Sequence, residues 1–365
     1  MESKGISHTQ LTALLWAGAL APAAELLPTV VLPEAGRGSW LAPLAAIPLV
    51  LCSGWLVGQL ADGEGLASGI RNSLGPVVGR IVLLLYIGWA VLLLALRLRL
   101  CAQRLLATGE RDGALWIFLL GAAVLVVWMG MGRLPAFARA GQLFLAILLA
   151  AGAAVLLLSL SRVELERILP LWREELWGGF RGALSTAGTL GWVFYGGFLL
   201  ERGGAKRPGR WYWPAWGIGG CALLALAQGI ILGNLGTELA GRLDSPFFTL
   251  AKSVGVEGAF QRVESVIAAI WTLADLALGV LLLFAIRAMG RPLLPKGKES
   301  WVAGGTFLLA LGLAFALFTG RSASEWNRTW VPAGNLLLGI LLPIIMVVWN
   351  VFCGKWRKRS TSCGQ

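Results

Sequence analysis

The chain has 365 residues, of which 57% are hydrophobic and 14% are charged, and its mean hydropathy is +0.74. Soluble domains carry about a quarter charged residues, so this composition indicates that lipid surrounds most of the chain. The formal net charge of +12 would suggest a nucleic-acid partner in a soluble protein. Here the basic residues lie in short connectors between apolar runs, as in loops that stay in the cytoplasm and meet anionic lipid. Composition therefore argues against nucleic-acid binding.

Runs of about 20 apolar residues recur along the whole sequence, and each is long enough to cross a bilayer as a helix. The sequence predicts an all-α integral membrane protein with one transmembrane domain over residues 1–365. The ten predicted spans cover residues 10–31, 40–59, 81–100, 114–131, 137–160, 180–200, 211–235, 263–286, 301–318 and 330–351.

Two longer connectors separate some of these spans. Residues 161–179 are expected to form an interfacial helix, and residues 236–262 a short helix or re-entrant element, although either could be a solvated linker. Arg262 and Glu264, at the entry to the eighth span, are expected to orient the connector or to meet a partner subunit.

The even number of spans and the basic tail of residues 352–365 predict that both termini are cytoplasmic. The five cysteines show no metal-ligand spacing, so no metal or cofactor is expected. HExxH and GxSxG motifs, phosphate-binding loops and a second histidine are all absent from the sequence, which indicates that the protein is not an enzyme.

Ten spans divide into two groups of five, over residues 10–160 and 180–351. Because five is odd, a repeated second half would enter the membrane from the opposite side, which is an inverted repeat. Spans 1 and 6 then correspond, and both are interrupted: span 1 contains Gly18, Pro22 and Pro28, and span 6 contains Gly188 and Gly191. Interrupted helices free main-chain groups in mid-membrane, so this pair predicts a binding site. The alternative is packing of small residues between helices.

Two acidic residues lie well inside spans, Glu25 beside the proline of span 1 and Asp275 in span 8. A carboxylate at this depth costs several kcal/mol unless it is protonated or paired, so both are candidates for function. Asp275 could instead make a structural hydrogen bond or ion pair. Arg97 and Arg99 lie near the end of span 3, from which they could reach the interface, and no role is assigned to them.

The chain resembles the B subunits of spore germinant receptors, the endospore germination permeases of the amino acid–polyamine–organocation transporter superfamily. The segment from Pro246 to Trp271 carries the closest likeness. The matching residues, in order, are Ile6-Ser7, Gln10, Leu26-Leu27-Pro28, Ala35-Gly36, Trp40, Gly132, Ala138-Arg139, Pro246, Leu250, Lys252, Phe260, Arg262, Glu264, Ile270 and Trp271.

This resemblance implies a ten-helix, LeuT-like fold in which spans 1 and 6 are unwound around a central site. One departure is Gly197, where members of the family often carry a glutamate, with Glu201 one turn later. Carried over by position, the ligand-binding residues would be Ala21, Pro22, Glu25, Gly191, Phe194, Tyr195 and Gly196, and the intramembrane Asp275 is added as a further candidate.

The resemblance also implies a function. The expected role is a germinant-sensing subunit in the inner membrane of the spore, which binds a small molecule such as an amino acid and assembles with A-type and C-type receptor subunits. The alternative is a secondary transporter of amino acids or amines, with Glu25 and Asp275 as candidate residues for proton coupling. Sequence does not separate the two, because a sensor that evolved from a transporter keeps the same fold and pocket.

Overall fold

The computed structural model describes residues 6–61, 65–108, 114–169, 171–200, 211–253, 263–294, 299–319 and 322–352. Secondary structure in these ranges is helical apart from an isolated bridge residue, turns and bends. Four of the sequence predictions concern Glu201, Arg262, the side chain of Glu264 and the basic tail, and these lie outside the described residues.

The first half of the chain forms seven α-helices and two 3-10 segments. They are α1 (His8–Ala35), η1 (Gly36–Leu41), α2 (Ala42–Ala45), α3 (Ile47–Leu60), α4 (Leu66–Leu74), α5 (Pro76–Thr108), α6 (Leu115–Gly130), α7 (Leu134–Leu160) and η2 (Leu165–Arg167).

The second half contains longer helices that alternate with short ones. They are α8 (Arg173–Leu190), η3 (Gly191–Leu199), α9 (Tyr212–Arg242), α10 (Pro246–Ser253), α11 (Val263–Gly290), α12 (Glu299–Ala316), α13 (Ser322–Arg328), α14 (Trp330–Leu336), η4 (Leu337–Leu341) and α15 (Leu342–Phe352). The helix α10 confirms that the connector over residues 236–262 contains a short helix. The connector over residues 161–179 holds η2 and the first turns of α8 in place of a separate interfacial helix.

Ser7 caps the N-terminus of α1, where it forms a reciprocal capping box with Gln10. Gly36 caps the C-terminus, and its φ of +48° lies in the region that favours glycine. Between these caps the helix is continuous, with Pro22 and Pro28 inside it. The expected unwinding of span 1 is therefore not observed. Each proline removes one main-chain donor, and the close packing of α1 against its neighbours holds the rest of the helix.

The interruption expected in span 6 is confirmed. Helix α8 ends at Leu190 and continues as the 3-10 segment η3 from Gly191. A second irregularity lies in the last span, where the π-helical η4 separates α14 from α15. Segments of 3-10 and π-helix within a longer helix often mark functional positions.

Six helical segments among the described residues are long and apolar enough to cross a membrane: His8–Leu60, Pro76–Ala107, Leu134–Leu160, Tyr212–Arg242, Ile267–Gly290 and Ser322–Phe352. The first of these, with 53 residues, contains two of the predicted spans. Two shorter apolar helices, Leu115–Gly130 and Ser300–Ala316, coincide with two more. The count of ten crossings stays a prediction, because length and apolar composition alone do not establish it.

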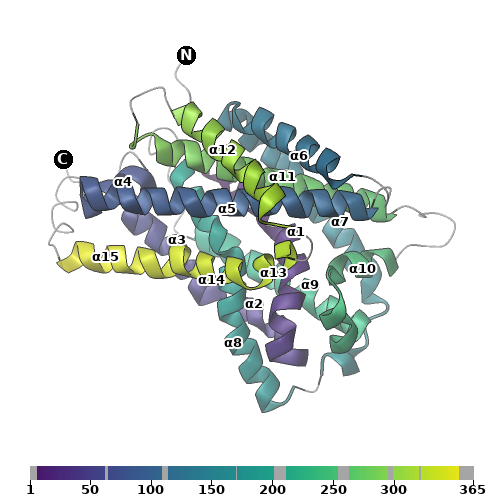
Figure 1. The fold of residues 1–365 in the computed structure, drawn as a ribbon. Helices are drawn as coiled ribbons and strands as arrows, with labels where there is room; N and C mark the ends of the chain where they lie inside the picture. Colours follow the sequence, from purple (N-terminus) through teal and green to yellow (C-terminus); the bar gives the residue numbers. More distant parts are fainter. Residues whose placement is uncertain are drawn as a thin grey trace.

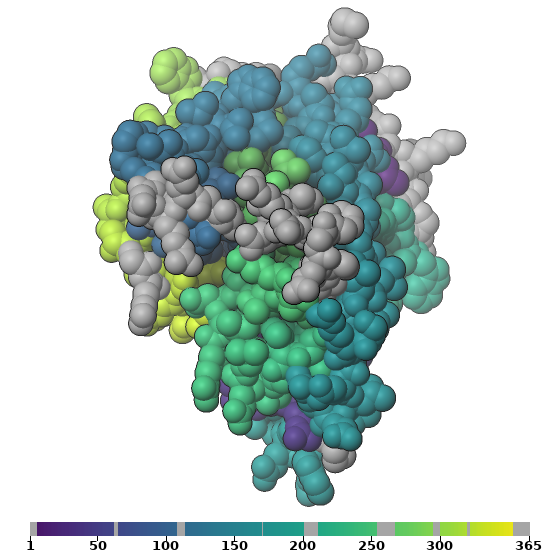
Figure 2. All heavy atoms as spheres, turned by 90° about the vertical axis from the view of Figure 1, so that its right-hand side faces the viewer, coloured from purple at the N-terminus to yellow at the C-terminus, as the bar shows by residue number. Residues whose placement is uncertain are grey.

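Helix α1 lies at the centre of the bundle, where it packs against α7, α8, α9 and α11. Figure 1 shows α5 and α11 running across the upper part of the view with α12 beside them, whereas α8 descends to the lower tip. Figure 2 shows the end of the bundle at which α5 ends, with the green atoms of the α9 and α10 region at the centre of that face. The site described next lies where α1, α5 and α11 meet.

A candidate ligand site between α1, α5 and α11

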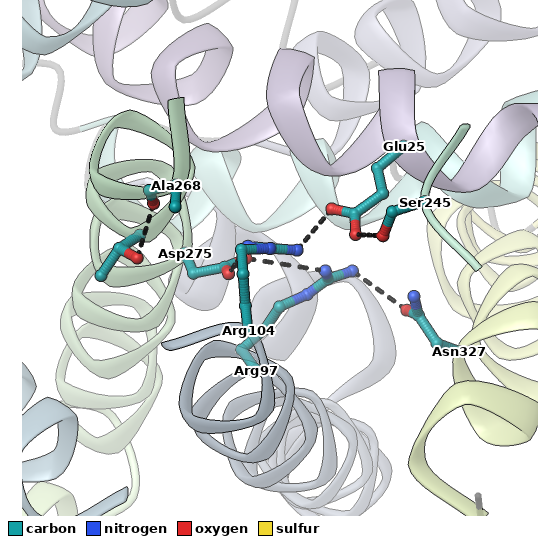
Figure 3. A network of polar contacts seen from close by, with 8 residues as sticks. Glu25, Arg97, Arg104, Ser245, Ala268, Asp275 and Asn327 are labelled. Atoms are coloured by element: carbon teal, nitrogen blue, oxygen red, sulfur yellow. Dashed lines mark hydrogen bonds and ion pairs between the residues drawn. The ribbon is translucent and has the colours of Figure 1, made fainter. Parts of the chain in front are cut away.

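A guanidinium from α5 joins the two intramembrane carboxylates. Arg104 contacts Asp275 of α11 through Nη1 and Glu25 of α1 through Nη2, as Figure 3 shows. The side chains are largely enclosed, with exposures of 13% for Arg104, 17% for Glu25 and 1% for Asp275. Hydrogen bonds between ionised groups are about twice as strong as neutral ones. The structure therefore brings together the two acidic residues that the sequence singled out.

Arg97 lies on the same face of α5, because seven residues are close to two helical turns. Its Nη1 is 4.0 Å from Asp275 Oδ1, and its Nη2 donates to Asn327 Oδ1 at 3.3 Å. Arg97 is 5% exposed. Arg97, to which the sequence assigned no role, therefore does not extend to the membrane interface: Asp275 and Asn327 hold it inside the bundle.

Sequence reasoning missed Arg104, since the predicted third span stopped at residue 100 whereas α5 continues to Thr108. The available signal was the spacing of seven between Arg97 and Arg104, which places two arginines on one face of a helix. The four charges of the cluster, two arginines and the carboxylates of Glu25 and Asp275, sum to zero. Two unit charges 4 Å apart interact by about 4 kcal/mol at an effective dielectric constant of 20, so removal of one member leaves a costly imbalance.

Helix α10 is tied to this cluster. The hydroxyl of Ser245, which precedes α10, donates to Glu25 Oε1 at 2.5 Å. Its neighbour Asp244 pairs with Arg328 of α13 at 2.8 Å. These two contacts attach the connector between α9 and α11 to α1 and to α13.

A cavity of about 270 Å³ lies against the cluster. Ligand pockets usually range from about 300 to 1,000 Å³. This cavity lies just below that range, so its size suits only a small ligand. Its wall is unusually polar for a membrane bundle, and the lining residues are Pro22, Glu25, Leu26, Thr29, Arg97, Leu100, Gln103, Arg104, Ala107, Asp244, Ser245, Phe248, Ser324, Asn327 and Arg328.

The predicted residues of span 6 lie elsewhere and do not line this cavity. The Tyr195 hydroxyl donates to the main-chain carbonyl of Tyr86 at 2.9 Å, and the Phe194 ring stacks on Tyr86 with centroids 5.4 Å apart. A Cβ at Gly191 would lie 2.9 Å from Asn335 Cβ, and one at Gly196 would lie 2.7 Å from a Leu15 methyl group. The two glycines thus permit close helix contacts, as the packing alternative requires.

Side chains satisfy main-chain carbonyls at both irregular segments. Asn335 donates to the carbonyl of Gly188 at 2.9 Å, just before η3, and accepts from the indole of Trp89 at 2.9 Å. The Tyr86 hydroxyl donates to the carbonyl of Leu338 in η4 at 2.7 Å. Part of the polar surface freed at these segments is therefore used by the protein itself.

Of the eight predicted site residues, the structure gathers Pro22, Glu25 and Asp275 at the charged cluster. Ala21 is buried beside Pro22 in α1 and does not line the cavity. Phe194 and Tyr195 belong to the aromatic group around Tyr86, whereas Gly191 packs against Asn335 and Gly196 against Leu15. In the described part of the chain, no set of three His, Cys, Asp or Glu side chains converges in a way that could hold a metal ion.

The fold is similar to those of solved structures. MhsT in complex with L-phenylalanine superposes with a TM-score of 0.62 at 15% identity, over 96% of this chain and 99% of that one. Mhp1, a nucleobase-cation-symport-1 family transporter in a closed conformation with bromovinylhydantoin bound, gives 0.56 at 14% identity, over 94% and 78%. At such identities the likeness concerns the fold alone, and it confirms an all-α membrane protein of the LeuT-like fold class.

The sequence places the chain more narrowly within that class. Residues 5–325 match the family described as spore germination protein, and the chain therefore belongs to that family. No curated protein matches the chain.

Proposed function

We propose that this protein is the ligand-binding membrane subunit of a spore germinant receptor, and that a small amino-acid-like germinant binds in the cavity beside Glu25 and Arg104. Membership of the spore germination family and the transporter-like fold support this proposal. The proposed location is the inner membrane of the spore, with both termini cytoplasmic. A-type and C-type receptor subunits are the proposed partners.

The observation that carries the proposal is the contact of Arg104 with both Glu25 and Asp275, beside a cavity that Glu25, Arg97 and Arg104 line. Charged groups inside a membrane bundle are expensive, and they are retained mainly where they bind a ligand, relay a proton or pair with each other. Here three helices contribute charges to one small space. A ligand in the cavity would contact α1 and α5 directly, and it would act on α11 through the pairing of Arg104 with Asp275.

The second candidate function is secondary transport, and one observation favours it. A cavity of about 650 Å³ lies at the opposite end of α5, lined by Arg71, Pro76, Phe198 and Arg291 among others. Phe198 is also part of the aromatic group around Tyr86. Cavities therefore lie toward both ends of α5, with aromatic side chains between them, as a permeation route would require.

The full-length protein in lipid nanodiscs is screened against amino acids, sugars and nucleosides by equilibrium binding. Saturable binding that is weakened by Glu25→Gln supports the proposal. Binding that is insensitive to changes at Glu25 and Arg97 would contradict the proposed cavity. Uptake of the bound compound into proteoliposomes, with and without a proton gradient, then separates the transporter from the sensor.

A further inference from the structure

We infer that Arg97 receives the carboxylate of a zwitterionic ligand and so selects that ligand class. The inference rests on the proposed function, which it makes more specific by naming the recognising side chain and the charge state of the ligand. Arg97 lines the cavity and is itself 5% exposed, so a ligand in that space meets a cation that is screened from water.

Helix α1 offers no free main-chain amides at this depth. The helix continues through Pro22 and past Glu25, so its N–H groups are taken up by helical hydrogen bonds. A carboxylate in the cavity therefore needs side-chain donors. Two guanidinium groups of the cluster line it, those of Arg97 and Arg104.

Arg97 and Arg104 differ in how tightly their guanidinium groups are paired. Arg104 is committed through Nη2 to Glu25 and through Nη1 to Asp275. Arg97 is held less tightly: its Nη1 is 4.0 Å from Asp275 Oδ1, which is beyond hydrogen-bond distance, and its Nη2 makes a 3.3 Å bond to Asn327. Asp275 Oδ1 is buried and accepts no hydrogen bond within the described structure. A carboxylate can thus contact Arg97 without breaking a short ion pair.

The arginines and carboxylates of the cluster sum to zero, and so does the neighbouring pair of Asp244 and Arg328. A ligand with a net charge would add a charge without a partner to groups whose charges are already balanced, and the burial of an unpaired charge is costly. A zwitterion adds none, and it places its carboxylate on Arg97 while its ammonium faces Glu25. Both residues line the same cavity, and Figure 3 shows Arg97 extending from α5 toward Asn327.

The test compares acids with their amides. L-alanine, L-valine and L-phenylalanine are each measured against the corresponding amino acid amide, which keeps the ammonium and lacks the carboxylate. Wild-type protein in nanodiscs is expected to bind at least one acid about 10- to 100-fold more tightly than its amide, the range expected for a hydrogen bond to a charged group. Arg97→Gln is expected to remove that preference, whereas Arg97→Lys retains part of it.

Arg99→Gln is the matched control, since Arg99 lies two residues further along α5, is half-buried and does not line the cavity. It is expected to keep the wild-type preference. If wild-type protein binds the acid and the amide equally, the inference is overturned. It is also overturned if Arg97→Gln keeps the wild-type preference for the acid. In both cases the cavity still binds an amine-bearing ligand, and the proposed function survives. If the wild-type protein binds no probe of any class in the wider screen, the proposed function itself fails.

Discussion

The carboxylates of Glu25 and Asp275 come from opposite halves of the chain, and both contact the guanidinium of Arg104. This single cation therefore links α1, α5 and α11 in the interior of the bundle. The same cluster forms part of a cavity wall, so its residues can both stabilise the fold and contact a ligand. Stability and ligand binding can be tested separately, because we expect Arg104 to determine mainly the first and Glu25 and Arg97 the second.

Replacement of Arg104 by Gln is expected to destabilise the protein. The change leaves two buried carboxylates near each other with Arg97 as their remaining cation, at 4.0 Å from Asp275. Breaking a buried ion pair by removing one partner costs about 3–5 kcal/mol, so a lower thermal midpoint and reduced yield are expected. Unfolding of the purified protein in detergent measures this.

The double variant Arg104→Gln with Glu25→Gln restores the balance between Arg97 and Asp275. It is expected to recover part of the lost stability. Arg99→Gln serves as the single-charge control on the same helix, and it is expected to change the midpoint little. Equal stability of Arg104→Gln and the wild type would show that the cluster does not stabilise the fold.

Replacement of Glu25 by Gln is expected to weaken binding of an amine-bearing ligand by about tenfold or more, the value of one lost charge-assisted contact. A neutral sugar or nucleoside should lose little. Equilibrium binding, corrected for the amount of folded protein, measures the effect. Glu34→Gln is the control, because Glu34 lies on the same helix and is exposed. A uniform loss of affinity across charged and neutral compounds would contradict a direct contact with the ammonium.

Much of the fold could be predicted from the sequence, because the membrane imposes simple rules. Apolar runs of about 20 residues give the spans, and Gly191 marks the change from α8 to the 3-10 segment η3. The continuity of α1 through span 1 was not predictable in the same way. Prolines occur in α1, but the packing of its neighbours keeps the backbone helical.

The candidate site was only partly predictable for a related reason. Glu25 and Asp275 stand out as acids within apolar runs, whereas Arg104 follows a run and looks like an interfacial residue in sequence. Ser245 and Asn327 are ordinary polar residues until the fold brings them to Glu25 and Arg97. The π-helical η4 contains Gly339 and is followed by Pro343, but glycine and proline also occur in regular membrane helices, so these residues alone do not predict it.

The cytoplasmic location of both termini is tested with the native residue Cys363, in a variant in which the other cysteines are replaced. An impermeant thiol reagent applied to right-side-out vesicles is expected to leave Cys363 unlabelled until the membrane is permeabilised. The prediction rests on the even number of spans and the basic tail. Labelling in intact vesicles would show that the tail is external. A cysteine placed at exposed Glu174, on the opposite side in this topology, is the positive control.

Replacement of Gly191 by Ala separates packing from ligand binding at the start of η3. An added Cβ would lie 2.9 Å from Asn335 Cβ and 3.0 Å from the Asn335 carbonyl oxygen, so α14 must move away. Overpacking of this kind costs about 1–3 kcal/mol, and a lower thermal midpoint is expected. Gly121→Ala is the matched control, since nothing lies within 4 Å of its Cβ, and alanine is expected to stabilise α6 by up to about 1 kcal/mol. If the ligand binds beside Glu25 and Arg97, the affinity of folded Gly191→Ala protein stays close to wild type. A large loss of affinity with no loss of stability would instead place the ligand at the start of η3.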